Sequence, residues 1–188
     1  MEAPGELILM GPPGSGKGTQ AKLLASRPDW LHLSTGDLFR ENLRNGTPLG
    51  RLAEQHMSKG EYVPDDVTVE MVRERMRQIA PRVHVVFDGF PRTVPQAEAL
   101  DALLADASRR VARVILIDVK RDELIARLAK RAEGRSDDSP EVARKRFDVY
   151  QEQTRAVVEH YERKGLVCRV DGIGTIDEVQ DRIRSAIP

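Results

Sequence analysis

The residues that most clearly indicate chemistry lie in a glycine-rich segment near the N-terminus. Residues 11–19 read Gly-Pro-Pro-Gly-Ser-Gly-Lys-Gly-Thr and follow four apolar residues, 7–10, that favour a buried strand. A glycine-rich loop between a strand and a helix is the arrangement in which backbone N–H groups surround a phosphate. Lys17 adds a positive charge, and the N-terminus of the next helix adds about half of one. The segment predicts a phosphate-binding loop; the alternative is a flexible Gly/Pro turn.

The glycines of this segment have different expected roles. Gly14 and Gly16 can adopt backbone conformations closed to other residues and leave room for an anion. The general pattern places Ser or Thr directly after the lysine, but here Gly18 stands between Lys17 and Thr19. Phosphate binding alone does not define a reaction.

A second informative segment, residues 85–93, reads Val-Val-Phe-Asp-Gly-Phe-Pro-Arg-Thr. Asp88 ends a predicted buried strand, where a carboxylate can hold a magnesium ion through water. Gly89 and Pro91 form a turn that brings Arg92 to the same edge of the sheet. The alternatives are that Asp88 caps a turn and that Arg92 forms a surface ion pair.

Two further sets of polar residues are weaker when considered alone. Residues 34–40, Ser-Thr-Gly-Asp-Leu-Phe-Arg, offer two hydroxyl groups and Arg40 at a helix start, but they also fit an ordinary helix N-cap. The second set comprises Arg127, Arg131, Arg135 and Arg146. Like charges four residues apart on a helix repel, so these arginines are either a solvated basic face or a phosphate clamp.

The elements that must position these residues alternate along the chain. Strands are predicted at residues 7–10, 31–33, 83–87, 114–119 and 166–170. Helices are predicted at residues 17–26, 36–45, 48–59, 65–80, 93–107, 120–131, 139–164 and 175–187. This alternation favours a parallel sheet with helices on both faces, an α/β fold. We expect a single domain over residues 1–188, because no repeat or linker divides the chain.

The longest predicted helix covers residues 139–164. Ser139 is a candidate cap and Pro140 the first helical residue. Its larger side chains fall three and four residues apart, at Phe147, Tyr150, Thr154, Val157 and Tyr161. By contrast, glycines and prolines break residues 36–64 into short helices, which predicts a small movable insert beside the phosphate-binding loop.

Composition excludes several classes of function. The 188 residues carry 30 basic and 30 acidic side chains, and only 4% are aromatic, so no overall charge attracts the chain to nucleic acid or to an anionic membrane. The N-terminus lacks the features of a secretory signal, and no segment approaches the ~20 apolar residues of a membrane span. One cysteine, Cys168, and four scattered histidines, interpreted as surface or partly packed, suggest no metal centre. We expect a cytoplasmic monomer.

Together these segments resemble the adenylate kinases among the nucleoside monophosphate kinases, nearly end to end. The shared motifs are residues 11–20, 34–37 and 88–93, followed by Pro95 and Gln96. Gly18 after the lysine is what this family carries. The resemblance implies a P-loop three-layer α/β/α fold with a five-stranded parallel sheet. It also implies an AMP-binding insert at residues 34–63 and a short lid at residues 130–140.

The resemblance also implies roles for individual residues. The ATP phosphates would be held by Gly14, Ser15, Gly16, Lys17, Gly18 and Thr19, with Arg127, Arg131 and Gly174 also contacting ATP. AMP would be held by Thr35, Arg40, Glu61, Tyr62, Val63, Gly89, Phe90, Pro91 and Arg92, with Gln96 contacting the adenine edge. Arg135 and Arg146 would bridge to the AMP phosphate, and the catalytic set would be Lys17, Arg92, Arg127, Arg135 and Arg146.

The chain departs from the family pattern at three places. Glu61 and Tyr62 replace residues that are often basic or aliphatic. Only three residues separate Arg131 from Arg135, which predicts a short lid without the zinc site of some long-lid members. Gly174 has no side chain, so its expected contact with adenine depends on the backbone alone.

The implied reaction is ATP + AMP ⇌ 2 ADP with Mg²⁺ bound through water to Asp88. It needs no general base, because an AMP phosphate oxygen is already an anion. One alternative is a UMP/CMP kinase; Thr35, Thr93 and Gln96 argue against it, since an amide offers a donor and an acceptor to adenine. The other alternative is a nucleotide-binding protein without catalysis, although every position of the expected cationic clamp is filled.

Overall fold

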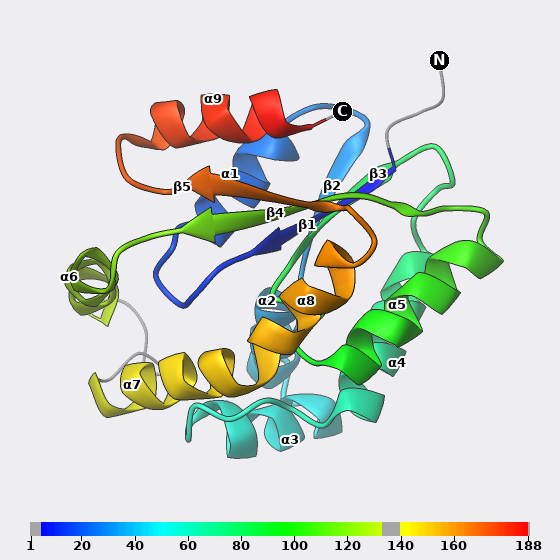
Figure 1. The fold of residues 1–188 in the computed structure, drawn as a ribbon. Coiled ribbons are helices and arrows are strands. Elements are labelled where there is room, and N and C mark those ends of the chain that lie inside the picture. The colour runs from blue at the N-terminus through cyan, green and yellow to red at the C-terminus, as the bar shows by residue number, and fades with distance from the viewer. Residues whose placement is uncertain (1–4, 133–139, 188) are drawn as a thin grey trace.

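The computed structural model describes residues 5–132 and 140–187, with side chains described outside residues 129–140. Its five strands are β1 (Glu6–Met10), β2 (Trp30–Ser34), β3 (His84–Asp88), β4 (Val111–Asp118) and β5 (Val167–Asp171). They form one parallel sheet in the order β2-β3-β1-β4-β5 (Figure 1). The helices are α1 (Lys17–Leu24), α2 (Thr35–Arg44), α3 (Pro48–Met57), α4 (Asp65–Arg77), α5 (Val94–Asp106), α6 (Arg121–Ala132), α7 (Pro140–Val149), α8 (Arg155–Glu162) and α9 (Ile176–Ala186).

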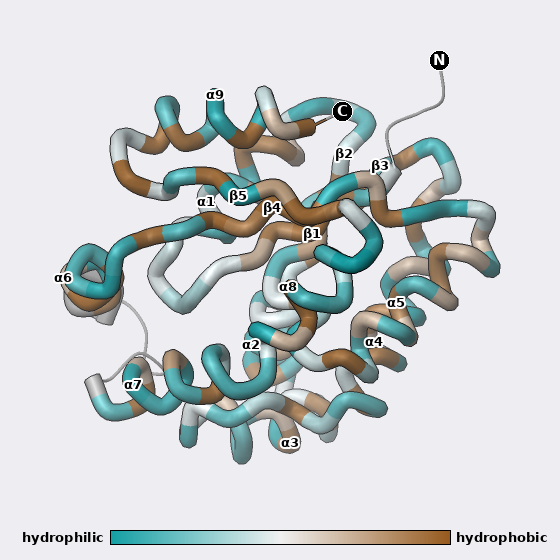
Figure 2. Tube along the Cα trace, viewed as in Figure 1, coloured by the Kyte–Doolittle hydropathy of each residue, from teal (hydrophilic) through white to brown (hydrophobic). Residues whose placement is uncertain are grey.

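Helices cover both faces of the sheet, as Figure 1 shows. Successive side chains of a strand point to opposite faces, so Leu7 and Leu9 of β1 join the core beneath α1 and α9. Ile8 and Met10 join the larger core under α4, α5 and α8. The central strand β1 is therefore buried on both faces, and Figure 2 shows β1 and β4 mostly in the brown of hydrophobic residues. The predicted α/β/α fold with five parallel strands is confirmed.

The register of the strands decides where the polar residues meet. Asp88 at the end of β3 lies opposite Ser34 of β2 on one side and Leu9 of β1 on the other. The glycine-rich loop begins one residue beyond β1. All these strand ends therefore share one edge of the sheet, the expected position of a ligand site in this class of fold.

The predicted insert packs on α4 through a small hydrophobic cluster. The helices α2 and α3 are capped by Ser34 and Thr47, whose side chains accept hydrogen bonds from the backbone N–H groups of Asp37 and Gly50. Phe39, Ala53 and Val63 of the insert form this cluster together with Met71 of α4, and Leu38 packs against both it and the larger core on the sheet. The glycines and prolines of this region therefore break it into two short helices, as predicted.

The predicted helix over residues 139–164 contains an interruption that its spacing did not indicate. A single π-helical turn, η1 (Tyr150–Thr154), separates α7 from α8. Ser139, the predicted cap, lies outside the described residues. Such turns in long helices often occur at functional sites, and here η1 contributes two side chains to the cavity described below.

Candidate active site

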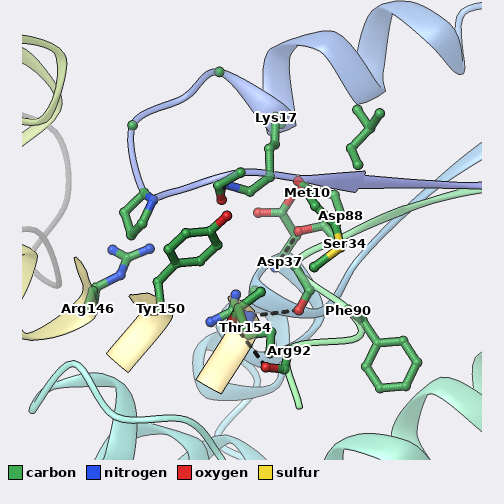
Figure 3. A pocket seen from close by; sticks show the side chains of 18 of the residues that line it. Met10, Lys17, Ser34, Asp37, Asp88, Phe90, Arg92, Arg146, Tyr150 and Thr154 are labelled. Carbon is green, nitrogen blue, oxygen red and sulfur yellow. Dashed lines mark hydrogen bonds between the residues drawn. The ribbon is translucent and has the colours of Figure 1, made fainter. Parts of the chain in front are cut away.

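A cavity of about 380 Å³ lies at the carboxyl edge of the sheet. The glycine-rich loop, the ends of β2 and β3, the insert, α6, α7 and η1 all contribute to its walls. Six cationic residues from distant parts of the sequence line it: Lys17, Lys22, Arg40, Arg92, Arg127 and Arg146. In Figure 3 the side chains of Lys17, Asp88, Tyr150 and Arg146 point into the same space.

The loop has the backbone that its glycines predicted. Gly14 has φ +86° and Gly16 has φ +93°, values that L side chains rarely adopt. A side chain at position 14 would also press on Leu128 at 3.1 Å, whereas position 16 faces open space. Lys17 Nζ donates to the carbonyls of Gly11 and Pro12, at 2.7 and 3.0 Å. The loop therefore holds its lysine at the cavity.

Asp88 has a partner that the sequence did not indicate. The Nε2 atom of His32 lies 3.1 Å from its Oδ2 atom. Burial disfavours the charged form of Asp88, but the hydrogen bond with His32 and the charges of Lys17 and Arg92 outweigh that cost, so its pKa lies below the ordinary 3.8. The carboxylate is therefore ionised beside the glycine-rich loop. His32 and Asp88 are 56 residues apart, and only the β2–β3 pairing brings them together.

Arg92 is held by several elements at once. Its Nε atom donates to the carbonyl of Gly89 at 2.7 Å, and its guanidinium lies 4.8 Å from the centre of the Tyr62 ring. Thr154 Oγ1 donates to the backbone carbonyl of Arg92 at 3.1 Å. Since the single hydroxyl proton of Thr154 is used there, the Tyr62 hydroxyl donates to Thr154 Oγ1, 2.9 Å away.

The other arginines lie on different sides of the cavity. Arg127 of α6 bonds Glu123 at 2.8 Å and the carbonyl of Gly172 at 3.0 Å, which links α6 to the connection after β5. Arg40 of α2 lies 2.6 Å from Asp37. Arg146 enters from α7. Cationic groups thus surround the cavity on several sides.

The turn η1 supplies two residues that were predicted only as one face of a helix. Tyr150 and Thr154 both line the cavity, opposite the glycine-rich loop. Burial raises the pKa of Tyr150 well above its ordinary value of 10.0, so its hydroxyl keeps its proton. It can therefore donate a hydrogen bond to an anion in the cavity.

A second cavity, of about 40 Å³, adjoins the first on the side of the insert. Its lining includes seven of the predicted AMP residues, namely Thr35, Glu61, Tyr62, Val63, Gly89, Arg92 and Gln96. Gly36, Tyr62, Gly89 and Arg92 line both cavities. A ligand spanning the two would therefore extend from the guanidinium groups to the side chain of Gln96.

Comparison with known proteins agrees with this geometry. Residues 9–166 match the adenylate kinase family. The chain belongs to that family. It is 48% identical over 183 residues to the adenylate kinase of Thermus thermophilus, covering 96% of each chain. It is 46% identical to that of Micrococcus luteus, covering 96% of this chain and 89% of the other. It is 45% identical to that of Thermobifida fusca, covering 96% and 97%.

Most of the residues selected by the family resemblance lie on one of the two cavities. Ser15 is buried within the loop. Gly174 is exposed on the connection between β5 and α9, and two residues away the carbonyl of Gly172 accepts from Arg127. The side chain of Arg131, and Arg135 as a whole, lie outside the described residues, as does most of the predicted lid at 130–140.

Proposed function

We propose that this protein transfers the γ-phosphoryl group of ATP reversibly to AMP, giving two ADP, as its family membership suggests. One observation supports this most directly: Lys17, Arg40, Arg92, Arg127 and Arg146 line one cavity beside a glycine-rich loop. Two nucleotides joined through their phosphates carry dense negative charge. Cations placed on several sides of that charge are suited to holding both phosphate chains.

In this proposal the glycine-rich loop holds the ATP phosphates, and the smaller cavity holds AMP. The loop offers backbone N–H groups at the start of α1 and the ammonium group of Lys17. Arg92 lines both cavities, which supports its proposed contact with the AMP phosphate where that group meets ATP. Arg127 holds ATP from α6 and Arg146 reaches the transferred group from α7. Arg131, Arg135 and Gly174 complete the proposed set.

The chemical step needs little from the protein besides position and charge. An anionic AMP oxygen attacks the γ-phosphorus as the bond to the β-phosphate oxygen breaks, so ADP leaves and no proton has to be removed. The protein brings two like-charged groups into line and stabilises the charge on the transferred group. Preorganised guanidinium groups in a cavity closed to water achieve this, and closure excludes water as a competing acceptor.

The residues at the cavity also suit magnesium. Mg²⁺ takes oxygen ligands, keeps several waters and binds through one or two carboxylates together with phosphates. Asp88 is ionised at this edge, and a side chain at position 18 would lie 3.3 Å from its Oδ2 atom, so Gly18 keeps the adjacent space open. Asp88 would hold the ion through water, and the ion would neutralise phosphate charge. Among the described residues, no three or more His, Cys, Asp or Glu side chains are grouped to hold a metal.

An acceptor screen tests the proposal. Formation of ADP or another diphosphate is followed with ATP, Mg²⁺ and each of AMP, CMP, UMP and GMP in turn. We expect turnover with AMP well above that with the other three. Faster turnover with CMP or UMP would assign the chain to another nucleoside monophosphate kinase, and none at all would leave a nucleotide-binding protein without catalysis.

The proposal includes a monomer that acts in the cytoplasm without nucleic acid or membrane partners. In the part of the chain that the structure describes, no helix has the length and apolar character to cross a bilayer. Light scattering at assay concentrations measures the mass directly, and a value near twice that of one chain would contradict the monomer.

A further inference from the structure

Asp65, the first residue of α4, lies in a closed ring of hydrogen bonds with Gln96 of α5 and with Thr93, which caps that helix. Its Oδ1 atom accepts from Gln96 Nε2 at 2.7 Å, and its Oδ2 atom accepts from Thr93 Oγ1 at 2.8 Å. The Thr93 oxygen in turn accepts from the backbone N–H of Gln96 at 3.3 Å. The ring joins the start of α4 to the start of α5, directly behind the smaller cavity.

Gln96 makes one more contact, which is with Arg92. Its Oε1 atom accepts from the backbone N–H of Arg92 at 2.8 Å. The residue is 1% exposed, yet it lines the smaller cavity. One lone pair of its oxygen and one hydrogen of its amide nitrogen remain for a ligand there.

The two fixed partners of this amide decide which way it faces. A carboxylate accepts hydrogen bonds and does not donate, so Asp65 requires the Gln96 nitrogen on its side. A backbone N–H group only donates, so Arg92 requires the oxygen on the other side. Turning the amide by 180° would place N–H against N–H and oxygen against oxygen. It would leave buried polar groups unpaired, which is costly.

We propose that Asp65 is a positioning residue that fixes the orientation of the Gln96 amide and thereby favours adenine over hypoxanthine and guanine. The inference rests on the proposed function, in which Gln96 contacts the adenine edge. Adenine presents an acceptor at N1 and a donor at N6. Hypoxanthine and guanine present a donor at N1 and an acceptor at O6, so an amide held in one orientation matches adenine and opposes the other two bases.

The test compares AMP with IMP as acceptors at saturating ATP and Mg²⁺. In Asp65→Ala the amide nitrogen of Gln96 loses its hydrogen-bond acceptor. Only the backbone N–H of Arg92 then disfavours the orientation in which the amide is turned by 180°. We expect KM for AMP to rise about tenfold, the loss expected for a hydrogen bond to a charged group, with kcat changed far less. The ratio of kcat/KM for AMP to that for IMP should fall by about the same factor.

Two variants separate positioning from a general effect on α4. Asp65→Asn can present its oxygen to Gln96 and its nitrogen to Thr93, so it should restore most of the selectivity. Asp66→Ala removes the neighbouring exposed carboxylate from the same helical turn and should leave the ratio at the wild-type value. Asp65→Leu, which keeps volume but cannot accept a hydrogen bond, replaces the alanine variant if that variant does not fold.

The outcomes distinguish this inference from the function on which it rests. Gln96→Leu should lower the AMP/IMP ratio at least as far as Asp65→Ala. A lowered ratio in Gln96→Leu with a wild-type ratio in Asp65→Ala would overturn the role of Asp65 alone. An equal fall in Asp66→Ala would also overturn it, since the helix charge would then be the cause. If wild type does not use AMP, the proposed function fails first.

Discussion

Arg92 meets the cavity with its side chain already supported, and each support comes from a different segment. The carbonyl of Gly89 accepts from its Nε atom, the Tyr62 ring faces its guanidinium, and Thr154 and Gln96 bond its backbone. A guanidinium ordered before substrate arrives loses less freedom when it binds a phosphate. This arrangement is consistent with a guanidinium that stabilises the transition state of phosphoryl transfer more than it strengthens binding of the substrates.

Replacing Arg92 by alanine should therefore reduce turnover strongly. We expect kcat to fall by about 10²–10³, by analogy with removal of one oxyanion-hole donor. Steady-state kinetics with saturating ATP and AMP measures the effect. Arg77→Ala, at an exposed arginine of α4, is the matched control and should behave as wild type. A folded Arg92→Ala enzyme with wild-type kcat would exclude Arg92 from the proposed chemistry.

The lowered pKa of Asp88 gives a prediction for stability. The folded protein holds this proton less tightly than the unfolded chain, so the ionised form stabilises the fold at pH values above 3.8. That contribution is lost as pH falls through the lower, folded-state pKa. We expect the free energy of unfolding of wild type, minus that of Asp88→Asn, to rise with pH up to the region of 3.8 and then stay level.

Urea titrations of both proteins at several pH values up to about 5.5, below the ordinary pKa of histidine, measure this difference. A difference that rises on acidification would mean that Asp88 binds its proton more tightly in the folded state, contrary to the structure.

For individual residues, the sequence indicated which side chains belong to the candidate site but not which side chains they contact. Asp88 and Arg92 were predicted at the sheet edge because they follow a buried apolar run. His32 was interpreted as surface or partly packed, and it is partly packed, yet its bond to Asp88 depends on the β2–β3 register. The link between Asp65 and Gln96 likewise joins two helix starts 31 residues apart. Contacts of this kind follow from the tertiary fold, which local spacing does not specify.

The turn η1 explains how one helical stretch presents several side chains to the same cavity. Arg146, Tyr150 and Thr154 are four residues apart and all line it. In an α-helix each step of four residues rotates the side chain by about 40°, so three such residues drift away from one direction. A π turn has more residues per turn and reduces that drift. The element therefore aligns these side chains with the glycine-rich loop.

A double-mutant cycle tests the link between this turn and the insert. Tyr62→Phe removes the hydroxyl that bonds Thr154 but keeps the ring over Arg92, and Thr154→Val removes the shared acceptor. We expect a coupling energy of about 1 kcal/mol in the free energy of unfolding, the typical net value of one hydrogen bond. Additive effects of the two substitutions would mean that the hydroxyls do not interact.

The limits of the helices and strands were largely predictable, and the exceptions have local causes. Apolar runs located every strand. However, β4 begins at Val111, three residues before the predicted start, because Glu6 and Leu7 of β1 pair with that segment. Arg113 interrupts the apolar pattern there, so the sequence did not indicate the longer strand. Spacings of three and four residues predicted the helix of α7 and α8. They could not reveal η1, because a spacing of four also fits a π turn.

At the scale of the whole molecule, the insert is the unit best able to move. Its buried side chains Phe39, Ala53 and Val63 pack with Met71 of α4 in a small cluster distinct from the two cores on the sheet, so a shift of α2 and α3 mainly disturbs this cluster and the packing of Leu38. Among its contacts with the rest of the molecule are two single hydrogen bonds, from Thr35 to the carbonyl of Gly89 and from Tyr62 to Thr154. Such bonds are each worth only about 1 kcal/mol net, so a ligand in both cavities can offset their loss.

We therefore expect residues 34–63 to show the largest displacement among the described residues when both nucleotide positions are filled. Crystals of the free protein and of its complex with a bisubstrate analogue, superposed on the five strands, measure it. A complex with AMP alone separates the contribution of the smaller cavity, and most of the shift should already be present there, because Thr35 and Tyr62 line that cavity. Superposition of the insert within coordinate error in all three states would mean that the cavity is preformed and that water must be excluded by another part of the chain.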